Sequence, residues 1–212
     1  MTTDEKALIA LLVMAFLLSH SEITAMATLI FTARMDSAKA SYQQASDTIG
    51  ADTDWEPSNA LQRQLRDSSE QDAQSISATY KADLGVQATS FVESWMTTHE
   101  SLEGCEAAAR AELAQWATTR AEWKSEQVAG YTCGSGANTG TNEWIDDLID
   151  EDIDLPAGIS ADDVIVTVLP EESSNDICKE YAGQSFDIDE IDDIPDFPVH
   201  LGCPHRKVIQ MK

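Results

Sequence analysis

The chain has 212 residues, with 13 Lys and Arg against 38 Asp and Glu, so its formal net charge is −25 at pH 7. This acidity excludes a nucleic-acid-binding protein, because too few basic groups are present to neutralise phosphates. The length is that of one domain, or of one domain with appendages. The acidic excess is greatest in the last third of the chain, where it favours solubility and attracts cations.

Residues 7–33 form an apolar segment without Lys, Arg or Pro. As a helix this segment is about 40 Å long, enough to cross the hydrocarbon core of a bilayer, which is about 30 Å thick. We therefore predict a transmembrane helix within residues 1–33. Polar residues interrupt the segment, and a carboxylate at membrane depth is costly unless it has a partner. We expect His20 and Glu22 to make contacts in an assembly.

Two other interpretations fit the same segment. Lys6, the apolar run and Ala25-Met26-Ala27 together have the order of a signal peptide with its cleavage site. Alternatively, the segment is the central helix of a soluble bundle. Intact mass and fractionation distinguish these interpretations from a membrane span.

The apolar pattern continues beyond residue 33 at helical spacing. Apolar residues recur mostly every three or four positions as far as Ile49, so we expect one helix to leave the membrane and continue as a stalk to about Thr48. The segment 50–58 has the glycine, aspartates and proline of a turn. Ser58 or Asn59 is suited to cap the helix that follows.

Two long amphipathic helices are predicted in the proline-free stretch that follows. Each has a narrow apolar seam, as in coiled coils and elongated bundles. The first seam comprises Leu61, Leu65, Ser69, Ala73, Ile76, Tyr80, Leu84, Ala88, Val92 and Trp95. The second comprises Leu102, Cys105, Ala109, Leu113, Trp116, Arg120, Trp123 and Gln127. Antiparallel packing buries both seams, so residues 34–129 are expected to form an elongated helical ectodomain.

Residues 130–212 are predicted to form a small acidic cap, β-containing or irregular. The glycine-rich run 130–137 is expected to end the helices, and 163–169 has the β-branched pattern of a strand. Two acidic-aliphatic passages, 144–156 and 186–195, lack the glycine and ligand spacing of an EF-hand loop. We interpret them as solvated acidic edges with inward isoleucines, which bind divalent cations weakly at most.

Four cysteines follow the predicted span, and none shows C-x-x-C spacing. An even number in an extracytoplasmic domain favours two disulfides. Pairing of Cys105 with Cys133 is disfavoured, because a helix places them too far apart for the linker to join. We expect each of these two to pair with Cys178 or Cys203, which ties the cap to the helices. The alternative is four free thiols in a reducing compartment.

A metal site is a minor alternative near the C-terminus, and no cofactor is predicted. His200, Cys203 and His205 lie within six residues and suit a transition metal, but no second cluster matches them. Catalytic motifs are missing from the sequence, including G-x-S-x-G, H-E-x-x-H and a phosphate-binding glycine loop. The sequence therefore predicts a protein that is not an enzyme.

The N-terminal layout is similar to that of pilin-like envelope proteins, including the TadE-type minor pilins of tight-adherence systems. The resemblance covers about the first 50 residues, with a hydrophobic helix that contains a glutamate and runs on as an amphipathic stalk. It implies that a glutamate near the hydrophobic segment pairs within the assembly, and the matching residues are Glu22 or Glu5.

The prediction is thus a mainly α, single-pass membrane-anchored protein with an extracytoplasmic, disulfide-tethered acidic cap. Its function is that of a structural or assembly subunit of an envelope filament, a surface appendage or a membrane complex. Its expected partners are the membrane and either further copies of itself or other envelope proteins. The alternative is a secreted or anchored binding module whose acidic cap captures cations or a basic protein.

Overall fold

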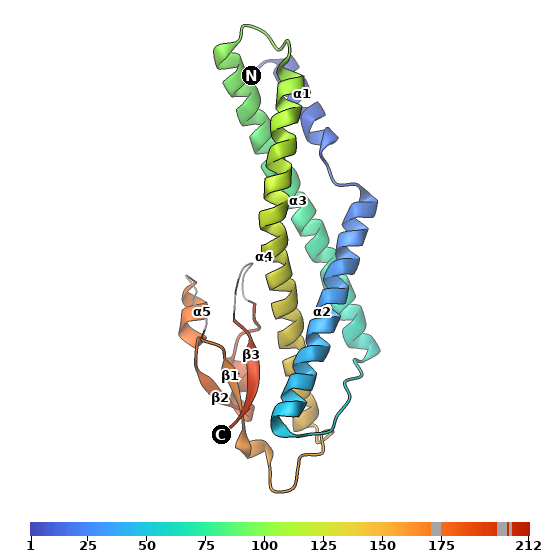
Figure 1. Cartoon of the computed structure of the whole chain (residues 1–212), viewed down its shortest axis with the longest axis vertical. Coiled ribbons are helices and arrows are strands. Elements are labelled where there is room, and N and C mark those ends of the chain that lie inside the picture. Colours follow the sequence, from blue (N-terminus) through green and yellow to red (C-terminus); the bar gives the residue numbers. More distant parts are fainter. Residues whose placement is uncertain (171–174, 199–202, 204) are drawn as a thin grey trace. The chain divides into compact units, whose positions relative to one another are not determined.

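The computed structural model describes residues 1–170, 175–198, 203 and 205–212, except for the side chain of Trp123. The chain is mainly helical, with a small antiparallel sheet near its C-terminus (Figure 1). The four long helices are α1 (Thr3–Ala15), α2 (His20–Ile49), α3 (Asn59–Thr98) and α4 (Cys105–Ile149). They are followed by η1 (Ala161–Asp163), β1 (Val164–Val168), α5 (Asp176–Tyr181), β2 (Ser185–Asp187), η2 (Ile188–Asp193) and β3 (Lys207–Met211).

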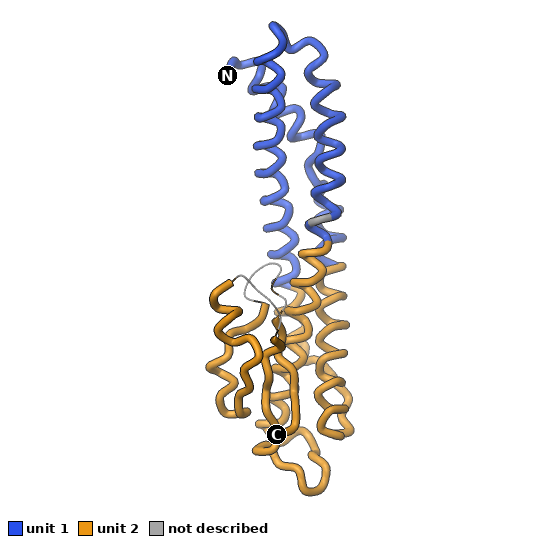
Figure 2. Tube along the Cα trace, turned by 60° about the vertical axis from the view of Figure 1, so that its left-hand side comes forward, with its two compact units in different colours: residues 1–28, 67–125 blue, residues 29–66, 126–212 orange. Residues whose placement is uncertain are grey.

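The chain divides into two compact units (Figure 2). Unit 1 comprises Met1–Thr28 and Asp67–Ser125, and unit 2 comprises Leu29–Arg66 and Glu126–Lys212. Helices α2, α3 and α4 each contribute residues to both units. The helices therefore do not end where one unit gives way to the other.

A helix continues past residue 33 to Ile49, close to the predicted end at Thr48, but the apolar N-terminal segment before it is broken into two helices, so the prediction of one continuous helix through that segment is wrong. Helix α1 ends at Ala15 and α2 begins at His20. The backbone N–H of Ser19 donates to Oε2 of Glu22 at 2.7 Å, and the N–H of Glu22 donates to Oγ of Ser19 at 3.3 Å. This reciprocal cap satisfies the free N–H groups of a new helix, so the polar interruption starts α2.

No single helix among the described residues is long and apolar enough to cross a membrane. Helices α1 and α2 pass the length and composition criteria only as a pair, bent by 47° at their break.

Unit 1 is built around the apolar seams of α3 and α4, which run antiparallel (Figure 1). Its buried core comprises Leu12, Leu84, Ala88, Val92, Cys105, Ala109 and Leu113. Six of these seven residues belong to the two predicted seams, and α1 adds Leu12. The rings of Tyr80 and Trp116 stack at 5.8 Å, and Arg120 pairs with Asp83 across the two helices. The prediction of an antiparallel helical pair is confirmed.

The turn before α3 is also confirmed. Helix α2 ends at Ile49, and Gly50 follows with a φ of 79°, which favours glycine. Oγ of Ser58 accepts the backbone N–H of Leu61 at 3.1 Å. Ser58 is thus the N-cap of α3.

The glycine-rich segment after residue 130 does not end the helix, contrary to prediction. Helix α4 runs through it to Ile149. Gly136 and Gly140 lie one turn apart and face the backbone of α2 within unit 2. A Cβ added at Gly136 would lie 2.8 Å from Cα of Arg34, and one added at Gly140 would lie 2.7 Å from the carbonyl carbon of Ala38. The glycines allow backbone contact between two helices, as in G-x-x-x-G pairs.

The small sheet of unit 2 has the strand order β2-β1-β3, with both pairings antiparallel. Strand β1 confirms the predicted strand, and Val164, Val166 and Val168 are fully buried. They share one core with Trp144 of α4 and with Tyr42 of α2. The β-containing C-terminal region is therefore confirmed, and it packs on helices of its own unit.

Candidate functional site

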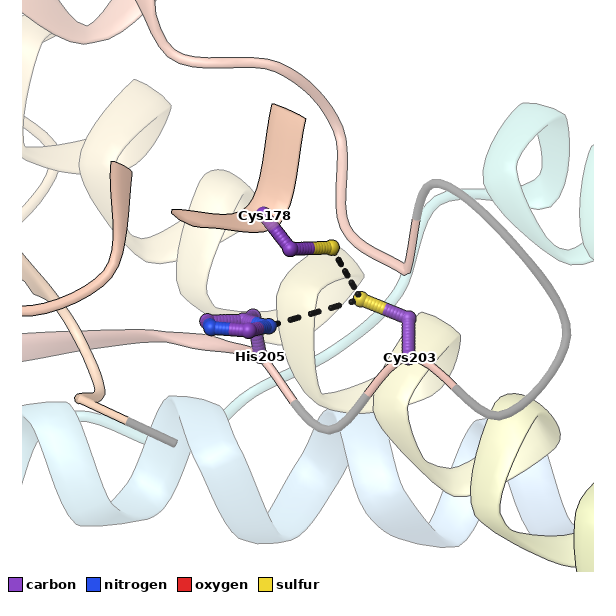
Figure 3. Close-up of side chains that lie close together, drawn as sticks. All are labelled: Cys178, Cys203 and His205. Atoms are coloured by element: carbon purple, nitrogen blue, oxygen red, sulfur yellow. Dashed lines mark hydrogen bonds between the residues drawn. The ribbon is translucent and has the colours of Figure 1, made fainter. Parts of the chain in front are cut away.

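Two thiols and an imidazole meet in the interior of unit 2 (Figure 3). The sulfurs of Cys178 and Cys203 are 3.4 Å apart, and the sulfur of Cys203 is 3.8 Å from Nδ1 of His205. One donor atom from each residue lies within 4.8 Å of the others. Figure 3 shows the sulfur of Cys203 between the other two groups.

Neighbouring groups position Cys178 and His205. Cys178 lies in the first turn of α5, where Oδ1 of Asn175 accepts the backbone N–H groups of Ile177 and Cys178. His205 comes just before β3, and the centroid of its ring is 5.8 Å from that of Phe197. The cluster therefore connects α5 to the residues that directly precede the edge strand β3.

The cluster is buried. The exposed fractions of Cys178, Cys203 and His205 are 0%, 4% and 0%. Among the described residues, Nε2 of His205 has no hydrogen-bond partner. A buried polar nitrogen without a partner is unfavourable, so this imidazole calls for an explanation beyond packing.

A cavity of about 710 Å³ reaches the cluster within unit 2. Cys203 and Arg206 line it together with residues of α2 and α4, among them Ser41 and Cys133. The cavity lies against Cys203, and that residue is only 4% exposed.

Three kinds of chemistry are open to such a group. Two thiolates and an imidazole bind transition metals, two adjacent thiols form a disulfide, and a thiolate beside an imidazole acts as a nucleophile. The nucleophilic use is disfavoured by burial, because a reactive cysteine needs access for its substrate.

The predicted cysteine pairing is not the one that the structure brings together. No disulfide joins any of the four cysteines, and the sulfur next to Cys178 belongs to Cys203. Cys105 lies in the core of unit 1, whereas Cys133 is exposed on α4 in unit 2. The assignment of Cys105 and Cys133 as partners of the other two is therefore corrected, because Cys178 and Cys203 meet each other.

The predicted assembly residues have local roles. Glu22 caps α2 through Ser19, as described above. Glu5 does the same for α1, since its Oε2 accepts the backbone N–H of Thr2 at 2.8 Å. His20 is exposed, and its carbonyl accepts the hydroxyl of Thr24. A partner contact at His20 or Glu22 stays a prediction, and His200 lies outside the described residues.

Large apolar side chains are exposed on α1, on α2 and in the connection between them. Exposed fractions are 46% for Leu11, 73% for Met14, 37% for Leu17 and 71% for Leu29. Scattered apolar residues are common on protein surfaces, and these four are divided between unit 1, with Leu11, Met14 and Leu17, and unit 2, with Leu29.

Carboxylates crowd the end of α4. Burial raises the pKa of Glu143, and the charges of Asp146 and Asp147 raise it further. Burial also raises the pKa of Asp146, with added repulsion from Asp147, Asp150 and Asp192. The folded protein therefore holds protons on these groups more tightly than the unfolded chain does.

One buried lysine faces this acidic edge. Nζ of Lys207 donates to Oδ1 of Asn142 at 3.2 Å and lies 3.6 Å from a carboxylate oxygen of Asp196. Burial lowers the pKa of Lys207, and the surrounding carboxylates oppose that shift. Because its folded pKa is lowered, the charged form of Lys207 is less favourable in the native state than in the unfolded chain.

Protonation of Glu143 and Asp146 is therefore expected to stabilise unit 2 as the pH falls from neutral toward the ordinary carboxyl range. A carboxyl group with a raised folded pKa binds a proton in the native state first, so the free energy of unfolding falls as the pH rises through that window. Glu143→Gln should raise the stability at pH 7 and flatten its pH dependence, as measured by urea unfolding at several pH values. Glu180→Gln, which removes an exposed charge, is the matched control. An unchanged pH dependence in Glu143→Gln would contradict this account.

Sequence reasoning missed Cys178 as a member of the cluster. It lies 25 positions before Cys203, and the fold alone brings the two together. The asparagine cap at 175 was a usable signal for the short helix, but nothing local indicated which partner its cysteine would meet. Comparison of the chain with models of protein families, with curated proteins and with solved structures finds no match.

Proposed function

We propose that this chain is a non-enzymatic, membrane-anchored structural subunit of a cell-envelope assembly, with its helical and acidic parts outside the cytoplasm. The observation that carries the proposal is the α1–α2 pair, which meets the length and composition criteria of a bent membrane span. The exposed apolar side chains on these helices support it, because they need an apolar environment.

Anchoring by α1 requires a change in unit 1. Leu12 of α1 is fully buried against the seams of α3 and α4, whose outer faces carry charged residues. Such helices do not enter a bilayer, so α1 must leave this core when it inserts. In detergent-free solution α1 should stay packed on α3 and α4, so the amides around Leu12 should exchange slowly. In vesicles α1 should leave this core and be surrounded by lipid.

The anchor is tested with substitutions that leave the core intact. We expect the full-length protein to stay in the membrane pellet after carbonate extraction. The triple variant Leu11→Lys, Met14→Lys and Leu17→Lys should be released, since lysine within a span is strongly unfavourable. Val86→Lys on α3 is the matched control, because this valine is 65% exposed and lies outside the pair. The proposal would be overturned if the triple variant stayed in the membrane pellet after carbonate extraction, or if the wild-type protein were found in the soluble fraction.

The assembly role of Glu22 needs a control for its cap. Glu22→Leu removes both the carboxylate and the cap, whereas Ser19→Ala weakens the cap and keeps the carboxylate. If Glu22 contacts a neighbouring subunit, cross-linked oligomers in membranes should disappear in Glu22→Leu and persist in Ser19→Ala. Equal loss in both variants would assign Glu22 to helix capping alone.

A further inference from the structure

We infer that Cys178, Cys203 and His205 bind a Zn²⁺ ion that holds the C-terminal part of unit 2 together. Two sulfurs and an imidazole nitrogen are a donor set that zinc selects, because it accepts soft thiolate and borderline nitrogen ligands. They supply three of the four ligands of a tetrahedral ion from residues that the structure describes.

The spacing of the donors fits this ion. Tetrahedral zinc, with bonds of about 2.3 Å to sulfur and about 2.0 Å to nitrogen, keeps its ligand atoms roughly 3.5 to 3.8 Å apart. The separations are 3.4 Å between the sulfurs and 3.8 Å between the sulfur of Cys203 and Nδ1 of His205, and all three donors lie within 4.8 Å of one another. Two of the three pairs are thus close to the spacing of a tetrahedral ion, and Cys178 and His205 would move together to complete it.

The burial of the cluster and its charge also support a bound zinc ion. All three groups lie in the interior, and Nε2 of His205 has no hydrogen bond among the described residues. Packing alone does not explain a fully buried imidazole with so few polar contacts. Two thiolates balance the charge of Zn²⁺, so the filled site adds no net charge to the interior, and the cavity lies against Cys203.

The ion would act as a structural crosslink. It would join α5 to the segment before β3, which are far apart in sequence and are both part of the C-terminal region of unit 2. This role is independent of membrane anchoring, so the two proposals fail separately. The main competitor is a disulfide between Cys178 and Cys203, which uses the same sulfurs but leaves His205 without a function.

Cobalt titration of the reduced full-length protein tests the site. Tetrahedral thiolate coordination gives Co²⁺ an intense visible spectrum and a sulfur-to-metal charge-transfer band. We expect these bands to saturate at one ion per chain and to vanish when Zn²⁺ is added. If no sulfur-to-cobalt charge-transfer band appears, the inference is wrong, even where cobalt binds in saturable amount.

Matched variants identify the ligands. Cys178→Ser, Cys203→Ser and His205→Gln should each weaken Zn²⁺ binding by more than about 100-fold, because even groups that only hydrogen-bond to a metal ligand contribute about 10–100-fold. Cys133→Ser, which removes an exposed thiol on the wall of the same cavity, should bind as the wild type does. Circular dichroism checks that each variant is folded.

The disulfide alternative is tested by adding a chelator and an alkylating reagent together at lysis. We expect Cys178 and Cys203 to be recovered as alkylated thiols, and a parallel sample without chelator or alkylating reagent to contain zinc in stoichiometric amount. A peptide pair joined through Cys178 and Cys203, or Cys203→Ser protein that binds zinc unchanged, would refute the metal site.

Discussion

Replacing Trp144 by alanine is expected to lower the free energy of unfolding of unit 2 by about 4 kcal/mol, which is within the range for a large buried aromatic residue. Trp144 is fully buried in the core that α4 shares with β1. Its Nε1 donates to Oγ of Ser46 at 3.0 Å, so the ring also connects α4 to α2. Truncation leaves a cavity and removes the indole bond to Ser46, whose hydroxyl keeps its hydrogen bond to Oγ1 of Thr53 at 2.6 Å.

Urea unfolding, together with hydrogen exchange of the α4 amides, separates the contribution of the buried ring volume from that of the hydrogen bond to Ser46. Trp144→Phe keeps most of the apolar volume and loses the hydrogen bond, so it should cost less than the alanine variant. A double-mutant cycle with Ser46→Ala should give a coupling of about 1 kcal/mol, the usual contribution of such a bond. A loss below about 1 kcal/mol in Trp144→Ala would show that the ring is not a core residue.

Periodicity predicted unit 1 well, because its core is a repeat along two helices. Leu84, Ala88 and Val92 recur every four residues, and they are all fully buried. Cys105, Ala109 and Leu113 follow the same rule on α4. In such a pair the buried face is fixed by spacing along one helix, so no knowledge of distant contacts is needed.

The end of α4 and the start of α2 could not be predicted from apolar periodicity. The glycines after residue 130 signal a linker by composition, yet Gly136 and Gly140 are helical because α2 lies against them. The residues Ser19 to Glu22 read as an interruption inside one span, and the reciprocal cap makes them a helix start. In both cases a tertiary or capping contact outweighs intrinsic propensity.

The cluster in unit 2 shows a similar limit. Cys203 and His205 were recognised as potential ligands because they are neighbours in sequence. Cys178 completes the group only after β1 and β3 pair and α5 packs beside them. Chemistry assembled by the fold is visible in sequence only where the donors are close together along the chain.

The double variant Gly136→Ala and Gly140→Ala is expected to destabilise unit 2 by about 3 kcal/mol, as overpacking against a rigid neighbour does. Each new methyl group meets backbone of α2, at Arg34 and at Ala38, where no side-chain rotation relieves the clash. The helices must therefore separate, which weakens the core around them. Intrinsic propensity acts in the opposite direction, since alanine is favoured over glycine in a helix by about 1 kcal/mol.

That opposition makes Gly130→Ala the informative control on the same helix. Nothing lies within 4 Å of a Cβ added there, so only the propensity term remains and stability should rise by up to about 1 kcal/mol. Urea unfolding and hydrogen exchange of α4 should thus move in opposite directions for the two changes. If the double variant is stabilised like Gly130→Ala, then α2 and α4 are not in backbone contact. The glycines would then have to be explained by something other than helix packing.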